Sequence, residues 1–210
     1  MAGRRSVAVA LDTRRRILSV AADMASVEGL EGLTVGRLAT ALEMSKAGVI
    51  GHFGSKLELQ LATLDHAAEV FRTEVWSPAA PQQEGLPRLV AICGAWMEYA
   101  GRPAFPGGCF LAAASFEFDS RPGPVRDALI TYLRRWHGTL VREISVAVSA
   151  GDLPETTNAE RLASALEAVA ARVTPTRELY GDPHAAAHAE ELMLAMLGRQ
   201  GLGDVPVLVP

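Results

Sequence analysis

The sequence predicts an all-α protein of about nine helices, and three observations support this class. Apolar residues recur three and four positions apart along most of the chain, which is the period of an amphipathic helix. Capping residues, Gly and Pro punctuate these stretches, whereas the alternation typical of strands is nearly absent. No apolar run approaches the roughly 18 residues of a membrane span, so we expect a soluble protein without a membrane partner.

The first helix is expected from Asp12, its N-cap, to about Val27, with Gly29 as its stop. Residues 1–11 would form a basic, mobile arm before it. The apolar run in this arm is shorter than the roughly 7–15 residues of a signal peptide core. Two cysteines are too few for a disulfide framework and fit a reducing compartment, so we expect a cytoplasmic protein.

Residues 34–53, TVGRLATALEMSKAGVIGHF, predict two short helices joined by a tight turn. Thr34 is the expected N-cap of one helix and Ser45 that of the next. The second of these helices begins with Lys46, Ala47 and Gly48, which are too small or too polar for a core helix. A helix-turn-helix protein inserts its second helix into the major groove N-terminus first, and short or basic leading residues permit this approach.

Further helices are predicted along the rest of the chain. The expected spans are 55–76, 86–100, 109–118, 124–150, 157–173 and 183–197. Ser55 with Glu58 and Thr157 with Glu160 form capping boxes, and Pro124 suits a first helical position. Residues 77–85 are expected to be a loop, and the tail 201–210 an ordered extension or a frayed end. The apolar positions expected to bury the 55–76 helix are Leu57, Leu61, Leu64 and Ala68.

Charge is distributed unevenly along the chain, whose formal net charge is −4. Residues 1–60 hold eight Lys/Arg and six Asp/Glu, a net charge of +2, and the remainder holds twelve and eighteen, a net charge of −6. Positive charge therefore gathers where the helix-turn-helix pattern lies. This asymmetry favours contact with phosphates there, while the acidic remainder limits non-specific binding.

Residues 12–62 resemble the DNA-binding domain of the tetracycline-repressor (TetR) family. The resemblance rests on RRRIL in the first helix, TVGRLA in the second, MSKAGVIGHFGSKLEL, and the HF-x-SK junction at residues 52–56. A looser likeness covers PGGCFLAAASFEFDSRPGPVRDAL. The resemblance implies an all-helical dimer with three N-terminal helices on DNA and, over residues 63–200, a domain that binds a small effector and dimerises.

The resemblance and the helix-turn-helix geometry together indicate residues for contact with double-stranded operator DNA. These are Thr34, Arg37, Ser45, Lys46, Ala47, Gly48, Ile50, His52 and Lys56. Lys46 is the foremost candidate, because it occupies the exposed first turn of the recognition helix. Many relatives have a tyrosine where Ile50 stands, so a phosphate contact is lost or replaced by contact with a thymine methyl group. Phe53 is expected to fill the small core beneath these helices.

Two further sets of residues are expected in the C-terminal part. Aromatic residues and a cysteine around the break at 101–108 are candidates for an effector pocket, although ordinary core packing is the alternative: Trp96, Phe105, Cys109, Phe110, Phe116, Tyr132 and Trp136. Apolar stripes interleaved with alanines in the last two helices are candidates for a homodimer interface, with internal packing as the alternative: Leu162, Leu166, Val169, Leu192, Met193 and Met196.

We interpret the chain as a ligand-responsive transcriptional regulator, a repressor that an apolar or aromatic effector releases from a pseudo-palindromic operator. An activator, or a scaffold without ligand, is an open alternative. A remote alternative is a thiol-dependent enzyme built on Cys109. The histidines lack metal-ligand spacing, and we find neither a phosphate-binding glycine loop nor a nucleophile elbow, so we expect no metal, cofactor or catalytic residue.

Overall fold

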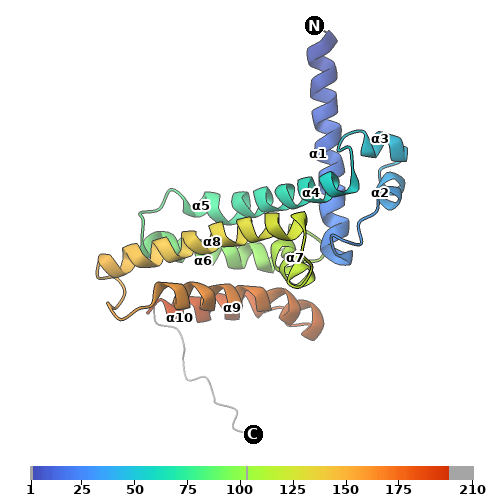
Figure 1. Ribbon diagram of the computed structural model, residues 1–210. Coiled ribbons are helices and arrows are strands. Elements are labelled where there is room, and N and C mark those ends of the chain that lie inside the picture. The colour runs from blue at the N-terminus through green and yellow to red at the C-terminus, as the bar shows by residue number, and fades with distance from the viewer. Residues whose placement is uncertain (1, 103, 199–210) are drawn as a thin grey trace. The chain divides into compact units, whose positions relative to one another are not determined.

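The computed structural model of the protein describes residues 2–102 and 104–198, and every regular element in these ranges is helical, which confirms the all-α prediction (Figure 1). Nine helices result when three contiguous elements within the described part are counted as one: α4 (Lys56–Phe71), the π-helical turn η1 (Arg72–Trp76) and α5 (Ser77–Ala79). The tail 201–210 lies outside the described residues. The helices divide between two compact units.

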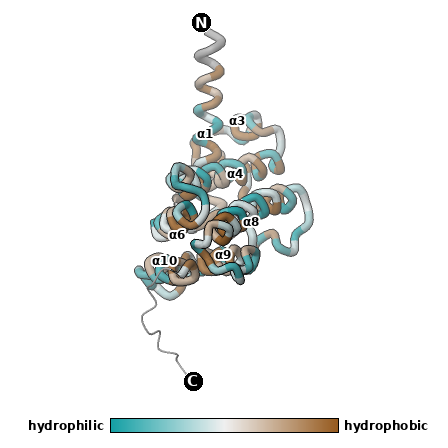
Figure 2. Tube along the Cα trace, turned by 90° about the vertical axis from the view of Figure 1, so that its left-hand side faces the viewer, coloured by the Kyte–Doolittle hydropathy of each residue, from teal (hydrophilic) through white to brown (hydrophobic). Residues whose placement is uncertain are grey.

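The first unit holds the described residues of 1–70 and 103–133. Its elements are α1 (Ala2–Glu28), α2 (Val35–Ala41), α3 (Lys46–Ile50), most of α4, α7 (Phe110–Phe118) and the beginning of α8 (Pro124–Ser149). Its core includes Ile17, Leu38, Val49 and Leu59, which are all fully buried. The α2–α3 pair lies beside α1, and the first turns of α1 project beyond it (Figures 1 and 2).

The second unit holds the described residues of 71–102 and 134–210. It contains η1, α5, α6 (Leu86–Gly101), the rest of α8, α9 (Ala159–Tyr180) and α10 (Ala185–Met196). The α6 and α10 helices pack closely on each other, and α10 also packs on α9. Cys93 of α6 is 1% exposed, and burial, followed by the charge of Glu190, raises the pKa of its thiol to about 12.

A histidine links α8 to α9 in the second unit. The Nε2 atom of His137 lies 2.7 Å from a carboxylate oxygen of Glu160, and its Nδ1 atom lies 2.9 Å from one of Glu167. Only the imidazolium form has two N–H donors, so both bonds form together when the ring is protonated. The hydrogen bond to Glu160 and then that to Glu167 raise the pKa of His137.

The α1 helix begins at Ala2, so the prediction that Asp12 starts it after a mobile arm is wrong. Residues 2–11 contain no proline, and the Thr13 hydroxyl donates to the Val9 carbonyl oxygen (3.0 Å), a bond made inside a helix. The carboxylate of Asp12 pairs with Arg15 (3.3 Å). The extension exposes the apolar side chains of Val7, Val9 and Leu11.

Three other predicted boundaries or faces need correction. Helix continues through residues 77–79, which were expected to be loop, because the π turn carries the helix onward to Ser77. Leu64 of α4 is buried as predicted, but the Leu57 side chain is 37% exposed, and the fully buried residue near the start of the helix is Leu59. Asn158 caps α9 in place of Thr157, since its Oδ1 atom accepts from the Arg161 N–H (2.9 Å).

The α9 helix continues past Val173 to Tyr180 although Pro175 lies inside it. A proline removes one backbone donor and crowds the preceding turn, so an end near Val173 was expected. The segment after Pro175 is anchored by Arg177, whose Nη1 atom donates to the carbonyl oxygens of Ala100 (2.8 Å) and Gly101 (2.9 Å) at the end of α6. This anchoring to α6 accounts for the longer helix.

Candidate nucleic-acid interface

The α3 helix is short, is capped at its N-terminus by Ser45, and is anchored in the core by Val49. The Ser45 hydroxyl accepts from the Gly48 N–H (2.9 Å), and the Thr34 hydroxyl accepts from the Arg37 N–H (3.3 Å) at the start of α2, which confirms both predicted caps. Val49 anchors α3 in the core at 0% exposure, while its first turn, with Lys46, is exposed. The N-terminus of α3, with the positive end of its helix dipole, therefore lies on the same exposed turn as the Lys46 side chain, and both favour an anion there.

Lys46 is free to meet an anion. The structure shows no ion pair between it and another described residue, unlike Arg37 and Lys56 of the same interface. Its stem crosses α2, where a Cβ added to Gly36 would come within 3.1 Å of the Lys46 Cε atom. Gly36, which sequence reasoning missed, thus leaves room for the end of the Lys46 side chain, and Lys46 as a whole is exposed.

Arg37 and Lys56 already have partners within the unit. The Arg37 guanidinium forms a two-point ion pair with the Glu28 carboxylate, and this hydrogen bonding raises the pKa of Arg37. The Lys56 Nζ atom donates to the Glu31 carbonyl oxygen (2.9 Å) and lies 3.6 Å from the Glu31 carboxylate. Either cation would have to share or exchange its partner to contact a phosphate.

The turn that follows α3 is held by Arg14, a second residue that sequence reasoning missed. Its Nη1 atom donates to the His52 carbonyl oxygen (2.6 Å), and its guanidinium carbon lies 4.3 Å from the centre of the Phe53 ring. Phe53 is 8% exposed, which confirms its expected place in the core. His52 and Ile50 are half-buried at the edge of the same surface.

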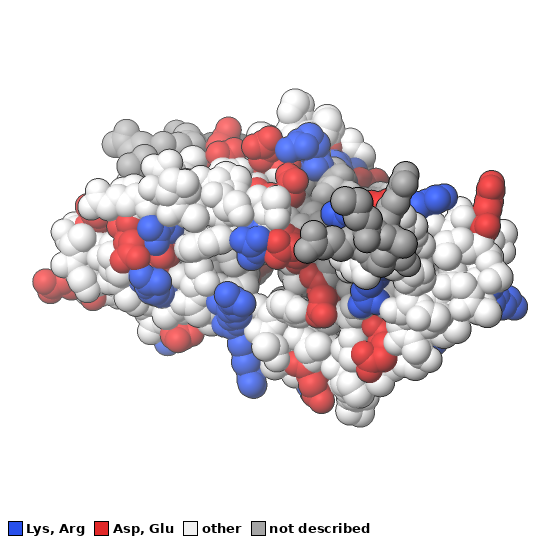
Figure 3. All heavy atoms as spheres, turned by 90° about the horizontal axis from the view of Figure 1, so that it is seen from above, with Lys and Arg blue, Asp and Glu red and all other residues white. Residues whose placement is uncertain are grey.

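Cations do not form one continuous patch on the face seen in Figure 3. The visible Lys and Arg side chains lie there in separate groups with Asp and Glu among them. Ion pairs within the chain also hold cations of this part, since Arg15 lies 3.3 Å from the Asp12 carboxylate. Of the site residues predicted from the sequence, the structure therefore brings the α2–α3 set together, and Lys46 is its cation without an ion-pair partner among the described residues.

The seven residues expected to line an effector pocket divide between the two units. In the second unit, Trp96 and Trp136 lie edge-to-face with ring centres 5.2 Å apart, and Phe71 packs edge-on against both. The Trp136 Nε1 atom is buried and has no hydrogen-bond partner among the described residues. These rings form an aromatic core around α6 and α8.

The other five of these residues belong to the first unit. Phe105 and Phe110 are buried with ring centres 5.8 Å apart, and the Tyr132 hydroxyl donates to Asp65 (2.7 Å). Cys109 is half-buried. Phe116 is 66% exposed, so the expectation that it lines an interior pocket is wrong, because α7 turns this side chain to the surface.

The predicted dimer residues of α9 and α10 are of two kinds. Leu166 and Met193 are fully buried, so they pack inside the second unit. Leu162 and Met196 are half-buried. Val169 and Leu192 line a groove of about 390 Å³ between α9 and α10, together with Ala168, Arg172, His188 and Ala189. A partner helix would find apolar side chains with a polar rim in this groove.

These features define the class of the protein: a capped helix pair that presents a short, basic-tipped helix is the architecture of a helix-turn-helix DNA-binding protein. The chain belongs to the tetR family of bacterial regulatory proteins. The family's N-terminal sequence model matches residues 17–63, and that of the tetracyclin repressor-like C-terminal domain matches residues 85–193. The protein is therefore a ligand-responsive DNA-binding transcriptional regulator.

Solved structures of other regulators share the fold. A TetR transcriptional regulator from Chloroflexus aurantiacus is 24% identical, with a TM-score of 0.82 over 91% of this chain and 96% of that one. AibR, crystallised with isovaleryl coenzyme A and operator DNA, is 20% identical, with a TM-score of 0.74 over 90% and 99%. A putative regulator from Saccharomonospora viridis in complex with choline is 19% identical, with a TM-score of 0.74 over 90% and 97%. No curated protein sequence matches the chain.

The described residues contain neither a membrane-spanning helix nor a metal-binding cluster. None of the helices between residues 2 and 198, as far as they are described, has the length and apolar character needed to cross a membrane. Within the same part of the chain, no group of three or more His, Cys, Asp or Glu side chains is arranged to hold a metal ion.

Proposed function

We propose that this regulator is a cytoplasmic repressor that binds a pseudo-palindromic operator as a homodimer and leaves it when a small effector binds. The observation that carries the proposal is the exposed first turn of α3, where Lys46 follows the Ser45 cap and has no ion-pair partner among the described residues. In a dimer, two such helices about 34–36 Å apart would enter successive major grooves. Residues 12–62 would form the DNA-binding domain, and residues 63–200 the effector and dimerisation domain.

The proposed DNA contacts at α2 and α3 are of three kinds: a cation, small side chains and hydroxyl groups. Lys46 would reach a base edge or a phosphate, and the small side chains of Ala47 and Gly48 would let the α3 backbone approach the groove. The Thr34 and Ser45 hydroxyls accept hydrogen bonds as caps, so each keeps its proton to donate to a phosphate.

The remaining predicted contacts lie around this centre. His52 and Ile50 border the recognition helix, and Ile50 could touch a thymine methyl group. Arg37 and Lys56 would bind phosphates by sharing or exchanging the bonds they make to Glu28 and Glu31.

The partner subunit would cover the groove between α9 and α10, because Val169 and Leu192 are the predicted interface residues that this groove leaves accessible. An apolar or aromatic effector would bind among the aromatic residues of the C-terminal part. The Trp96–Trp136 pair supports this chemistry, and we assign no catalytic step to the protein.

The test is selection of bound duplexes from a random pool, followed by affinity measurements on the selected sequence. We expect an inverted repeat, and Lys46→Ala should weaken its binding about tenfold or more, as loss of a base contact does. Arg135→Ala, an exposed cation of α8, removes the same charge and should leave the affinity nearly unchanged. Failure of the folded protein to enrich any duplex at low salt would refute the proposal.

Lysine footprinting supplies an independent readout, because Lys46 and Lys56 are the only lysines in the sequence. An amine-acylating reagent followed by mass spectrometry should modify Lys46 in the free protein and spare it when the selected duplex is bound. Equal modification of Lys46 with and without the duplex would exclude it from the interface.

A further inference from the structure

Side chains of two other helices bind the turn between α1 and α2 at Leu30 and Glu31. The Leu30 and Glu31 N–H groups donate to the two carboxylate oxygens of Glu117 in α7, at 2.7 and 2.9 Å. The Leu30 carbonyl oxygen accepts from the Gln60 amide (3.0 Å), and that of Glu31 accepts from Lys56 (2.9 Å), both in α4. All four backbone polar groups of Leu30 and Glu31 thus bond to Glu117, Gln60 or Lys56, which we call the turn clamp, and the Leu30 carbonyl oxygen also accepts from the Leu33 N–H (3.4 Å).

The fit of Glu117 to this turn depends on glycine. Gly29 has a φ of +83°, and a Cβ there would lie 2.8 Å from the Glu117 Oε1 atom. A second close approach lies nearby, where the Gly107 N–H donates to the Ser26 hydroxyl (3.0 Å). A Cβ on Gly107 would lie 1.9 Å from the Ser26 carbonyl oxygen. The segment leading into α7 therefore rests directly on the end of α1, with no space for a side chain.

The turn clamp joins two parts of the chain that the family comparison assigns to different domains. Glu117 lies within the match to the C-terminal domain, and the turn lies within the match to the N-terminal domain. Both belong to the first compact unit, so α7 packs as part of the body that carries α2 and α3. Because the chain leaves this turn to enter α2, the direction of α2 and α3 relative to α1 depends on how the turn is held.

We propose that Glu117 is a positioning residue for DNA binding, and that the turn clamp is where a movement of α7 or α4 reaches the recognition helix. This inference rests on the proposed function as an operator-binding repressor. A carboxylate that accepts two N–H groups is a strong, directional hold. Displacement of α7 would leave both N–H groups without their acceptor, release the turn, and change the orientation of α3.

Glu117→Gln tests this directly, because glutamine keeps the size and one acceptor oxygen but replaces the other by a donor that faces an N–H group. Glu58→Gln is the matched control, since Glu58 is an exposed residue of α4 and loses the same charge. Removing a negative charge should by itself raise affinity for DNA. The proposal predicts that Glu117→Gln instead lowers the affinity for DNA.

Two measurements decide the outcome. Hydrogen exchange of the Leu30 and Glu31 amides should become about tenfold faster or more in Glu117→Gln and stay unchanged in the control. Affinity for the selected duplex should fall about tenfold relative to the control, because the turn no longer fixes α3. Gln60→Met, which removes a bond to the same turn from the α4 side, should lower affinity in the same direction without altering α7.

The results separate the inference from the function on which it rests. Tryptophan fluorescence checks that the rest of the chain is folded, because Trp76, Trp96 and Trp136 all belong to the second unit. A purely structural role would lower the melting temperature while leaving duplex affinity equal to that of the control, and this would overturn the inference. Unchanged exchange at Leu30 and Glu31 would also overturn it. If the unaltered protein selects no duplex, the proposed function fails and the inference falls with it.

Discussion

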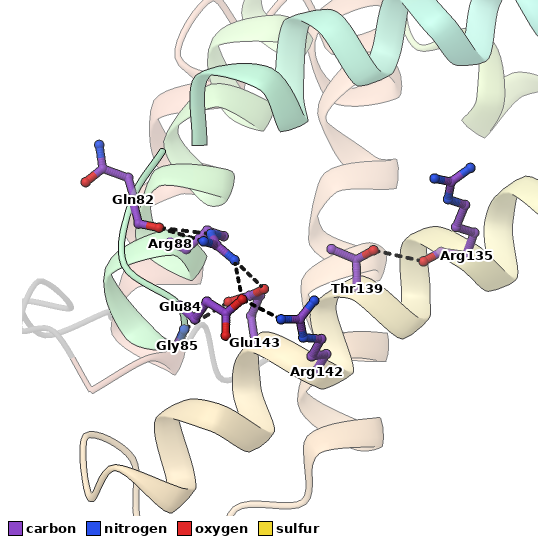
Figure 4. Close-up of polar contacts among 8 residues, drawn as sticks. All are labelled: Gln82, Glu84, Gly85, Arg88, Arg135, Thr139, Arg142 and Glu143. Carbon is purple, nitrogen blue, oxygen red and sulfur yellow. Dashed lines mark hydrogen bonds and ion pairs between the residues drawn. The ribbon is translucent and has the colours of Figure 1, made fainter. Parts of the chain in front are cut away.

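Glu143→Gln should destabilise the second unit more than any surface change, because Glu143 is a fully buried carboxylate (Figure 4). Its oxygens lie 3.2 Å from an Arg88 nitrogen and 2.9 Å from the Gly85 N–H. Arg88, only 13% exposed, also donates to the Gln82 carbonyl oxygen at 2.8 and 3.1 Å. These bonds tie the chain between α5 and α6 to α8.

The size of the stability loss depends on which hydrogen bonds Arg88 and Gly85 keep after Glu143→Gln. Removing one partner of a buried ion pair costs about 3–5 kcal/mol, because the other charge stays buried without compensation. The amide oxygen of the substituted side chain could still accept from Gly85, and Arg88 keeps the Gln82 carbonyl, so we expect the lower end, about 3 kcal/mol. For a chain of this size, about 2–4 °C is lost per kcal/mol, which gives a fall in melting temperature of roughly 6–12 °C.

The assay is thermal unfolding followed by tryptophan fluorescence, because all three tryptophans report on the second unit. Glu84→Gln is the control: Glu84 pairs with Arg88 and Arg142 in the same cluster but is half-exposed, and water screens its charge. We expect little shift for Glu84→Gln. If both variants melt within a degree or two of each other, the argument that burial governs this cluster is wrong.

Three further predictions concern single groups. The second unit should lose stability as pH rises above about 6.5, the ordinary pKa of histidine, and His137→Gln should remove this slope in fluorescence-detected unfolding. The pKa of His137 is raised in the folded state by the two α9 carboxylates, so its stabilisation is complete below the unfolded value of about 6.5 and disappears above the folded one. In the native protein a thiol reagent should modify half-buried Cys109 before Cys93, whose pKa burial raises to about 12; equal labelling by mass spectrometry would contradict this. Arg14→Ala should destabilise the first unit by about 2 kcal/mol and Arg16→Ala far less, as hydrogen exchange in α3 would report.

Local chemistry explains which elements were predictable from the sequence. Thr34, Ser45 and Pro124 act through backbone groups within a few residues, so their roles as caps and as a first helical residue are visible in the sequence. The end of α9 was not predictable, because Arg177 holds the helix beyond Pro175 by bonding to α6, more than seventy residues earlier in the chain. The start of α1 was missed because Asp12 can serve equally as a cap or, as observed, as an ion-pair partner inside a helix.

In the DNA-binding site, too, features set by neighbouring residues were predictable and features set by distant parts of the chain were not. The exposed tip of α3 follows from its own sequence, and Lys46 was therefore predictable. The partners of Arg37 and Lys56 were not, because Glu28 lies on α1 and Glu31 in the turn after it, and only the fold brings them together. Glu117 gave no signal at all in the sequence, since a glutamate in an apolar helix predicts only an exposed position.

Lys56 belongs both to the turn clamp and to the proposed set of DNA contacts. An ammonium group has three donors, of which one reaches the Glu31 carbonyl oxygen and one faces the Glu31 carboxylate at 3.6 Å. A third donor remains for a phosphate, so a single lysine can hold the turn and bind DNA at once. Because a bound phosphate and the Glu31 carboxylate would attract the same charge, the proposed DNA contact of Lys56 would couple DNA binding to the turn clamp, and each would change the strength of the other.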